Sequence, residues 1–163
     1  MTQSIKKPNG LIWLIVAAIA FVIDIISKLA IHYTFNLYDS IQILPFFSIT
    51  YVRNIGAAFS MFEGQRWALA VIALLVSAFI LYTLYKNNRD KKLENSALAL
   101  ILGGALGNLF DRLYHGYVID FLDVNFGNWH YPTFNIADCS ICVGVALYVL
   151  SGLLTKKNTE KKS

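Results

Sequence analysis

Residues 97–113 read ALALILGGALGNLFDRL, an apolar run whose last turns carry Asn, Asp and Arg. A helix needs about 20 such residues to cross ~30 Å of hydrocarbon. Stretches of similar character lie at 11–31, 67–85 and 136–154. The chain is 56% hydrophobic and 15% charged, whereas soluble domains carry roughly 25% charged residues. These features predict a mainly α membrane protein, a bundle of four transmembrane helices.

The first apolar run has some features of a cleavable signal peptide. Lys6 and Lys7 precede it, and Ala18-Ile19-Ala20 has the small-residue pattern of a cleavage site. The run continues through Ile23, however, and is too long for the apolar region of a signal peptide. We therefore expect a retained helix, with residues 1–163 forming a single integral membrane domain.

The positive charges predict how the chain crosses the membrane. Cytoplasmic loops of membrane proteins carry an excess of Lys and Arg. Four crossings place all three basic clusters on one side; they are Lys6 and Lys7, then Lys86, Arg89, Lys91 and Lys92, then Lys156, Lys157, Lys161 and Lys162. Both termini are then cytoplasmic, and the connections 33–66 and 114–135 are extracytoplasmic. These clusters lack the interleaved aromatic residues of a nucleic-acid surface, so no nucleic-acid partner is expected.

The two extracytoplasmic connections contain candidate strands. Residues 43–52 are rich in β-branched and aromatic side chains and are interrupted by Pro45. Residues 117–124 have a similar composition, and 54–59 offer a turn followed by small residues. We expect a small extracytoplasmic β-sheet on the outer face of the bundle.

Polar residues from distant segments converge at one depth when the helices are oriented in this way. Asp24 and Lys28 fall in the outer part of the first helix, Asn108, Asp111 and Arg112 near the outer end of the third, and Asn135 and Asp138 at the start of the fourth. An ionisable group within a membrane costs about 2.5–3.5 kcal/mol on insertion scales, so such groups indicate function. The spacing of Gly103 and Gly107 predicts close packing of the third helix.

Two of the acids have no basic neighbour in the sequence, namely Asp120 and Asp138. By contrast, Asp24 has Lys28 four residues on and Asp111 adjoins Arg112, so a structural role in fixing the bundle is the stronger interpretation for those pairs. Two carboxyl groups that meet in an apolar setting can divide their tasks. One stays protonated while the other activates water, as in aspartic proteases.

Other chemistries are less well supported. His32, His115 and His130 are scattered, which is typical of hydrogen-bonding residues at an interface. Cys139 and Cys142 have a redox or zinc spacing but lack a second ligand pair, so we expect buried, inert thiols. No metal or cofactor is expected.

Two non-enzymatic alternatives remain open. A small transporter or proton-coupled channel also uses intramembrane acids, but it requires polar residues along the full depth of the membrane. A purely structural four-helix protein leaves the unneutralised acids at 120 and 138 unexplained.

The polar motifs together resemble the bacterial lipoprotein signal peptidases (signal peptidase II). The likeness spans nearly the whole chain, and it rests on five ordered motifs: DIISK (24–28), VRNIGAAF (52–59), GGALGNLFDR (103–112), VIDF (118–121) and FNIAD (134–138). Ile119 stands where the family often has Val, a conservative change.

The resemblance implies an intramembrane aspartic endopeptidase of the bacterial cytoplasmic (inner) membrane, with Asp120 and Asp138 as the catalytic dyad near the extracytoplasmic face. It implies cleavage of diacylglyceryl-modified prolipoproteins just before the lipidated cysteine. Membrane lipids and cyclic depsipeptide inhibitors such as globomycin are the other partners that it implies. Polar residues supporting the dyad and substrate would be Asp24, Lys28, Asn54, Asn108, Arg112 and Asn135.

Overall fold

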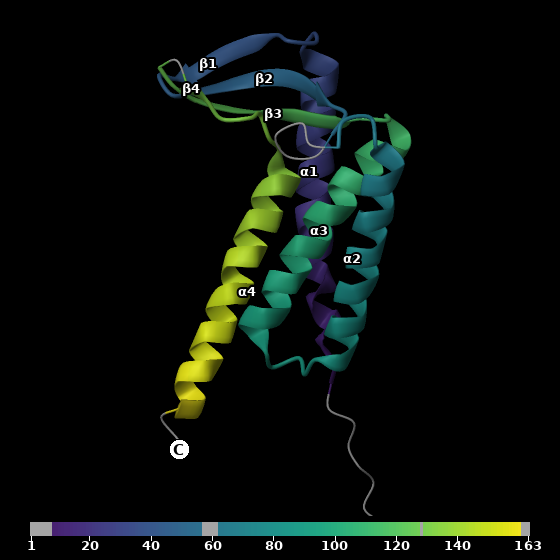
Figure 1. The fold of residues 1–163 in the computed structure, drawn as a ribbon, viewed down its shortest axis with the longest axis vertical. Helices are drawn as coiled ribbons and strands as arrows, with labels where there is room; N and C mark the ends of the chain where they lie inside the picture. Colours follow the sequence, from purple (N-terminus) through teal and green to yellow (C-terminus); the bar gives the residue numbers. More distant parts are fainter. Residues whose placement is uncertain (1–7, 57–61, 128, 161–163) are drawn as a thin grey trace, which may run out of the picture.

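A computed structural model describes residues 8–56, 62–127 and 129–160 of the chain. A short 3₁₀ turn, Gly10–Trp13, leads into the first of four long helices. All four are long and apolar enough to cross a membrane, which with the sheet described below confirms the predicted fold class (Figure 1). The helices are α1 (Leu14–Thr34), α2 (Arg66–Lys86), α3 (Lys92–Tyr114) and α4 (Ile136–Glu160).

Helix α3 is the centre of the bundle. In its most apolar window 61% of the residues are buried, against 22% in α1 and α2 and 11% in α4. The predicted close packing at Gly103 and Gly107 is confirmed, and both face α1. A Cβ atom on Gly103 would lie 2.6 Å from the carbonyl oxygen of Ala17, and one on Gly107 would collide with the carboxylate of Asp24. Only glycine therefore allows α1 to approach this closely.

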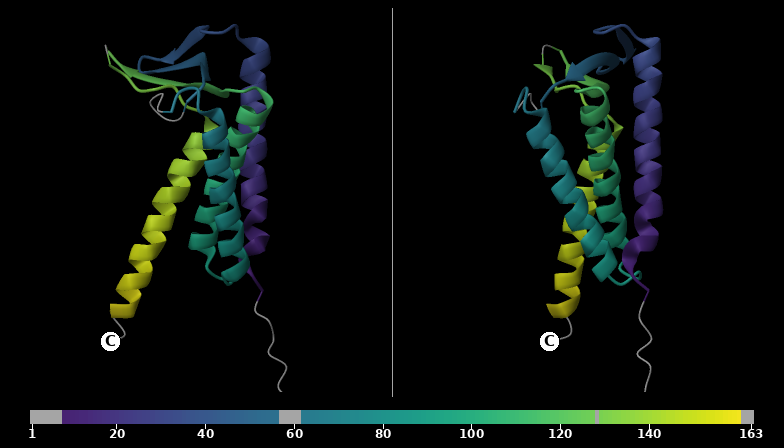
Figure 2. Two further views of the ribbon diagram at one scale, coloured as in Figure 1. Left: turned by 45° about the vertical axis from the view of Figure 1, so that its right-hand side comes forward. Right: turned by 90° about the vertical axis from the view of Figure 1, so that its right-hand side faces the viewer.

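Helix α4 packs against α3 mainly through its N-terminal half. Its C-terminal half diverges from the other three helices (Figure 2). The first turn of α4 thus lies inside the protein beneath the sheet, whereas its later turns expose apolar side chains such as Val149 and Leu153. The α4 helix is therefore fixed to the bundle mostly at the end that carries Asp138.

A four-stranded antiparallel sheet lies across one end of the bundle (Figure 1). Its strands, in spatial order, are β1 (Ser40–Leu44), β2 (Phe47–Asn54), β3 (Val118–Phe126) and β4 (Trp129–His130). The predicted interruption at Pro45 is the turn between β1 and β2. The strand β4 was not predicted, and residues 57–59 of the predicted turn lie outside the described residues.

The sheet is fastened to the bundle by side chains from one face. Tyr51, Ile119 and Phe121 are buried together with Ile31 of α1. Phe134, the first residue of the FNIAD motif, also joins the sheet. It exchanges backbone hydrogen bonds with Leu122 of β3. This bridge brings the beginning of α4 beside β3.

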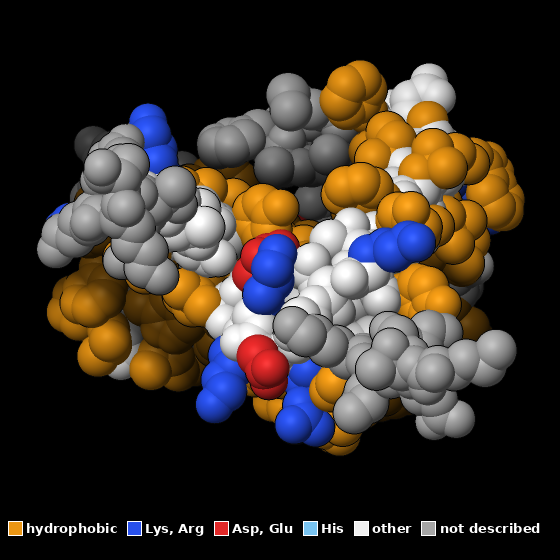
Figure 3. All heavy atoms as spheres, turned by 90° about the horizontal axis from the view of Figure 1, so that it is seen from below, with side chains coloured by type: hydrophobic (Ala, Val, Ile, Leu, Met, Phe, Trp, Pro, Cys, Tyr) orange, Lys and Arg blue, Asp and Glu red, His pale blue; other side chains and the backbone are white. Residues whose placement is uncertain are grey.

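The end of the bundle opposite the sheet carries many of the basic residues. Lys and Arg side chains gather there with a few acidic ones between them (Figure 3). The α2–α3 connection and the last turns of α4 supply those that the structure describes, Lys86, Arg89, Lys91, Lys92, Lys156 and Lys157. Lys6, Lys7, Lys161 and Lys162 lie outside the described residues.

Candidate active site

The structure brings all eight predicted site residues into one network of hydrogen bonds and ion pairs at the sheet end. They come from α1 (Asp24, Lys28), β2 (Asn54), α3 (Asn108, Arg112), β3 (Asp120) and the start of α4 (Asn135, Asp138). Segments more than a hundred residues apart therefore meet at one point, as the predicted topology required.

Asp138 and Asn135 form a reciprocal cap at the start of α4. The backbone N–H of Asp138 donates to Oδ1 of Asn135 over 3.0 Å, and the backbone N–H of Asn135 donates to Oδ2 of Asp138 over 3.2 Å. This is the capping-box arrangement, which satisfies backbone donors that the helix itself cannot. The other carboxylate oxygen of Asp138 accepts from Nδ2 of Asn108 over 2.8 Å. Both oxygens of Asp138 thus accept hydrogen bonds at a helix N-terminus, where negative charge is favoured.

Asp120 is held differently, on β3 and in a more enclosed position. Its Oδ2 accepts from Nδ2 of Asn54 over 2.9 Å, and its Oδ1 accepts from Nδ2 of Asn135 over 2.6 Å. The side chain is 2% exposed. Burial, and then the nearby charge of Asp138, raise the pKa of Asp120 to about 7. A substantial fraction of Asp120 is therefore protonated near neutral pH.

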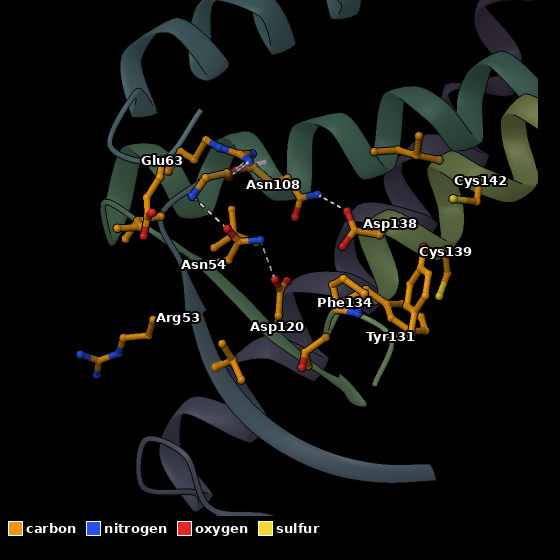
Figure 4. Close-up of a pocket in the computed structure, with 18 of the residues that line it drawn as sticks. Arg53, Asn54, Glu63, Asn108, Asp120, Tyr131, Phe134, Asp138, Cys139 and Cys142 are labelled. Atoms are coloured by element: carbon orange, nitrogen blue, oxygen red, sulfur yellow. Dashed lines mark hydrogen bonds between the residues drawn. The ribbon is translucent and has the colours of Figure 1, made fainter. Parts of the chain in front are cut away.

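Asn135 and Asn108 connect the two acids. The Nδ2 group of Asn135 donates to Asp120 and also, over 3.1 Å, to Oδ1 of Asn108. In Figure 4 Asp120 approaches from the strands and Asp138 from α4, and both face the same cavity. Amide side chains therefore fix both acids without adding a charge.

Arg112 supplies a positive charge to this region. Its guanidinium donates to the backbone oxygens of Asn108 over 3.2 Å and Gly56 over 2.9 Å, and it interacts electrostatically with Asp138 and Asp120. Arg112 also interacts electrostatically with Asp111, as their adjacency in the sequence predicted. The cation in close contact with Asp111 is, however, Lys28, whose ammonium group lies 3.1 Å from the carboxylate.

A buried ionic cluster lies directly behind the two acids. The Nζ of Lys28 is 2.7 Å from Asp24 Oδ2, as the spacing predicted, and donates to Oδ1 of Asn108 over 2.9 Å. Asp24, Lys28 and Asp111 are each at most 1% exposed. The second oxygen of Asp24 accepts from the backbone N–H of Ala137 over 2.8 Å, and Asp111 accepts from that of Ile119 over 3.0 Å. The cluster thus holds the chain beside each of the two acids.

A cavity of about 700 Å³ opens onto the two acids (Figure 4). Its polar part is formed by Asn54, Asn108, Arg112 and the acids, and its apolar part by side chains of α4 such as Ile141 and Val143. The loop from Tyr131 to Phe134 forms another wall. Sequence reasoning missed this loop as part of the site; its aromatic residues around Pro132, just before the FNIAD motif, were the available signal.

The cysteines and histidines differ from expectation. Cys139 is half-buried, Cys142 is exposed, and both line the cavity, so the prediction that they are buried is wrong. The rings of His32 and His115 are not scattered but lie 5.4 Å apart. Within residues 8–56, 62–127 and 129–160, no three His, Cys, Asp or Glu side chains are grouped to hold a metal ion.

One motif residue lies at the cavity without facing the acids. Arg53 contributes to the lining, but its guanidinium points away from Asp120 and Asp138 (Figure 4). Its Nε donates to the hydroxyl of Tyr51 over 3.1 Å, and its charge lies 4.7 Å from the ring centroid of Tyr117. Its position between sheet residues indicates a role in the sheet.

The fold and the site together define an integral membrane protein with a pair of carboxyl groups facing a cavity at one end of its bundle. A family model described as signal peptidase (SPase) II matches residues 16–154. The chain belongs to this family, the lipoprotein signal peptidases, which are aspartic proteases that remove signal peptides from prolipoproteins.

Relatives and solved structures agree with this assignment. A lipoprotein signal peptidase of Actinobacillus succinogenes is 49% identical over 97% of this chain and 98% of its own length. That of Haemophilus influenzae (strain Rd) is 46% identical over 93% of this chain and 91% of its own. A solved structure described as a bacterial membrane enzyme superposes with a TM-score of 0.85 and 32% identity, covering 94% of each chain.

Proposed function

We propose that Asp120 and Asp138 are the catalytic dyad of this peptidase, and that it cuts diacylglyceryl-modified prolipoproteins just before the lipidated cysteine. The observation that carries the proposal is the placement of two carboxyl groups, joined by Asn135, on one cavity. Their surroundings differ in a way that separates their roles. Asp138 sits at a helix N-terminus with hydrogen bonds to both oxygens, and Asp120 is the more enclosed acid with a raised pKa.

In this mechanism Asp138 is the general base and Asp120 the general acid. Asp138 removes a proton from a water molecule as the water oxygen attacks the scissile carbonyl carbon. Asp120 donates its proton to the carbonyl oxygen, and Arg112 lies close enough to stabilise developing negative charge. When the tetrahedral intermediate collapses, the carbon–nitrogen bond breaks and the proton held by Asp138 passes to the leaving amine of the cysteine. Asp120 regains its proton from the hydroxyl group of the intermediate.

The remaining predicted residues position this pair. Asn54 and Asn135 orient Asp120, and Asn108 orients Asp138. Lys28 donates to the oxygen of Asn108, which polarises the amide and strengthens its donation to Asp138. Asp24 fixes the start of α4 through Ala137.

The lining of the cavity is complementary to a lipidated peptide. A polar floor around the dyad suits the peptide backbone, and the apolar wall of α4 suits acyl chains and the apolar part of a signal peptide. A cyclic depsipeptide such as globomycin would place a hydroxyl group between the carboxyl groups, where the attacked carbonyl oxygen would lie.

The topology that we propose places the dyad near the outer surface of the bacterial inner membrane, with both termini in the cytoplasm and residues 1–163 as one membrane domain. The basic residues at the end opposite the sheet support this orientation. Cysteine substitutions at positions 7, 90 and 160 should escape an impermeant thiol reagent applied to intact cells. Labelling at any of these positions from outside would contradict the topology.

The transporter alternative is less well supported. Among the described residues, the buried acidic and basic side chains are Asp24, Lys28, Asp111 and Asp120, and all belong to the network around the dyad. A continuous polar path requires such groups at the other end of the helices as well.

The decisive experiment is cleavage of a purified lipidated preprolipoprotein by detergent-purified protein, read as a gel shift. Asp120→Asn and Asp138→Asn should each abolish cleavage, because neither acid can perform both proton transfers. Asp123→Asn is the matched control, since it makes the same change on β3 at a residue that does not line the cavity. Near-normal turnover by either folded dyad variant would exclude that acid from catalysis.

A further inference from the structure

A second hollow lies at the opposite end of the bundle from the dyad. It measures about 470 Å³ and is lined by Ile12, Trp13, Ile15, Arg89, Asp90 and Lys92. None of these residues lines the catalytic cavity. The hollow lies between the beginning of the first membrane helix and the α2–α3 connection, at the end where Lys and Arg gather (Figure 3).

The walls of this hollow combine two kinds of surface. Ile12 and Ile15 are 63% and 62% exposed, on the part of the chain that enters the membrane. Arg89 and Lys92 are exposed cations at its polar side. A ligand that satisfies both surfaces needs an anionic group joined to an apolar chain, which is the chemistry of an anionic phospholipid.

The polar and apolar walls are held together by hydrogen bonds of the protein. The indole Nε1 of Trp13 donates to the backbone oxygen of Arg89 over 3.2 Å. The backbone N–H of Arg89 donates to the oxygen of Pro8 over 3.0 Å, and that of Gly10 donates to Asn87 over 2.9 Å. The hollow is thus formed before any ligand arrives, which lowers the entropic cost of binding.

The carboxylate of Asp90 limits which lipid headgroups the hollow can bind. A carboxylate in the lining repels a simple anion, but it accepts hydrogen bonds from hydroxyl groups. A headgroup with a phosphodiester and free hydroxyls can place its charge near the two cations and its hydroxyls near Asp90.

We propose that this hollow is a binding site for an anionic glycerophospholipid with a hydroxyl-bearing headgroup, of which phosphatidylglycerol is the simplest. The phosphodiester lies between Arg89 and Lys92, the glycerol hydroxyls donate to Asp90, and one acyl chain follows Ile12 and Ile15. In the proposed topology this lipid belongs to the inner leaflet. Its binding stabilises the contact between the N-terminal segment and the α2–α3 connection and takes no part in peptide hydrolysis.

Fluorescence of Trp13 provides the test. The chain has three tryptophans, so Trp67→Phe with Trp129→Phe leaves Trp13 as the only indole. This protein is reconstituted into phosphatidylcholine vesicles that contain increasing fractions of phosphatidylglycerol with brominated acyl chains. We expect saturable quenching that exceeds the quenching by brominated phosphatidylcholine at equal bromine content. Equal quenching by the two lipids would overturn the proposal.

Substitutions distinguish a specific lipid site from a general attraction of anionic lipids to basic residues. Arg89→Gln with Lys92→Gln should raise the half-saturating lipid fraction on the order of tenfold. Lys156→Gln with Lys157→Gln removes the same charge from the same end of the bundle, on α4, and should leave the curve unchanged. An equal loss in both pairs would show diffuse attraction only. Asp90→Asn should reduce the preference for phosphatidylglycerol over phosphatidic acid, and an unchanged preference would contradict the assigned headgroup.

A measurement on the unaltered protein covers the case in which the Arg89 and Lys92 variant does not fold. Native mass spectrometry of protein released from mixed vesicles should show one retained phosphatidylglycerol in excess of its share of the bilayer. Retention in proportion to bilayer composition would overturn the proposal.

Discussion

The side-chain amide of Asn135 lies 2.6 Å from Oδ1 of Asp120, while its carbonyl oxygen caps the backbone of Asp138. One residue thus caps the start of α4 and links the two acids. These two tasks use different atoms, so they can be separated by substitution.

Asn135→Asp should keep the helix cap but lose the amide donor to Asp120. We expect little change in thermal stability and a loss of most cleavage activity, because a third negative charge then faces the dyad. Asn135→Ala should lose both the donor and the cap, with an additional loss of about 1 kcal/mol in stability. Thermal unfolding in detergent, together with the gel-shift assay, measures both. An Asp variant that cleaves normally would contradict the role of the amide.

The charge of Lys28 is expected to hold the structure behind the dyad. Lys28→Met removes the ammonium group that lies between the buried carboxylates of Asp24 and Asp111, and we expect a loss of about 3–5 kcal/mol in unfolding free energy. Adding Asp24→Asn and Asp111→Asn removes the uncompensated charges and should recover much of that stability. Unfolding in denaturant measures the three-way comparison. If the triple variant is no more stable than Lys28→Met, the loss comes from packing and not from charge.

The raised pKa of Asp120 predicts a pH limit on catalysis. In the proposed mechanism Asp120 must be protonated to donate to the carbonyl oxygen, so the cleavage rate should fall as the pH rises above about 7. The two acids titrate as a coupled pair, so the observed limit belongs to the dyad. Initial rates across a pH series check this expectation. A rate that continues to rise well above pH 7 would contradict the assignment of Asp120 as the acid.

The raised pKa of Asp120 also makes the stability of the fold depend on pH. A carboxyl group in an unfolded chain has a pKa of about 3.9, so between that value and about 7 the folded protein binds more protons at Asp120 than the unfolded chain does. This contribution to stability is fully present at low pH and is lost as the pH rises through about 7. Asp120→Asn should therefore show a smaller decline in Tm over this range.

Close packing at Gly107 is expected to affect the position of Asp138 indirectly, through Asp24. A Cβ atom there would displace the Asp24 carboxylate, which holds the backbone of Ala137 at the start of α4. We expect Gly107→Ala to cost about 1–3 kcal/mol in stability and to lower cleavage. Gly152→Ala is the matched control, because no atom of the residues that the structure describes lies within 4 Å of the added methyl group. Equal effects of the two substitutions would contradict this account.

The position of Cys139 and Cys142 in the cavity lining gives a test of where the substrate binds. The double Cys139→Ala and Cys142→Ala variant should still cleave, and EDTA should leave the rate unchanged. Alkylation of the unaltered protein with a bulky maleimide should block cleavage, because both thiols line the cavity. The double variant should resist the same reagent. Inhibition of both proteins would indicate an effect elsewhere in the molecule.

Much of this fold is visible in the sequence because its strongest signals are local. Apolar length identified the helices, and the break at Pro45 separated β1 from β2. Convergence of Asp24, Asn108 and Asp138 followed from alternating helix directions, which place the same end of each helix at the same depth.

The structure differs from the sequence-based predictions mainly where contacts depend on helix rotation and tilt. Asp111 adjoins Arg112 in sequence, but successive residues on a helix point in different directions, and Asp111 turns toward Lys28 on α1. The exposure of Cys142 depends on how α4 leaves α3, which its apolar composition does not reveal. Strand β4 has only two residues, too few for an alternating pattern.

The reciprocal cap between Asn135 and Asp138 has a consequence for biosynthesis. Helix α4 is synthesised after α1, α2 and α3, and its first turn docks onto α1 through Asp24 and onto α3 through Asn108. Until that docking occurs, Asp120 has no second carboxyl group beside it. If the two acids are the catalytic dyad, as proposed, a half-inserted chain carries no assembled hydrolytic centre, and activity arises only when α4 has docked.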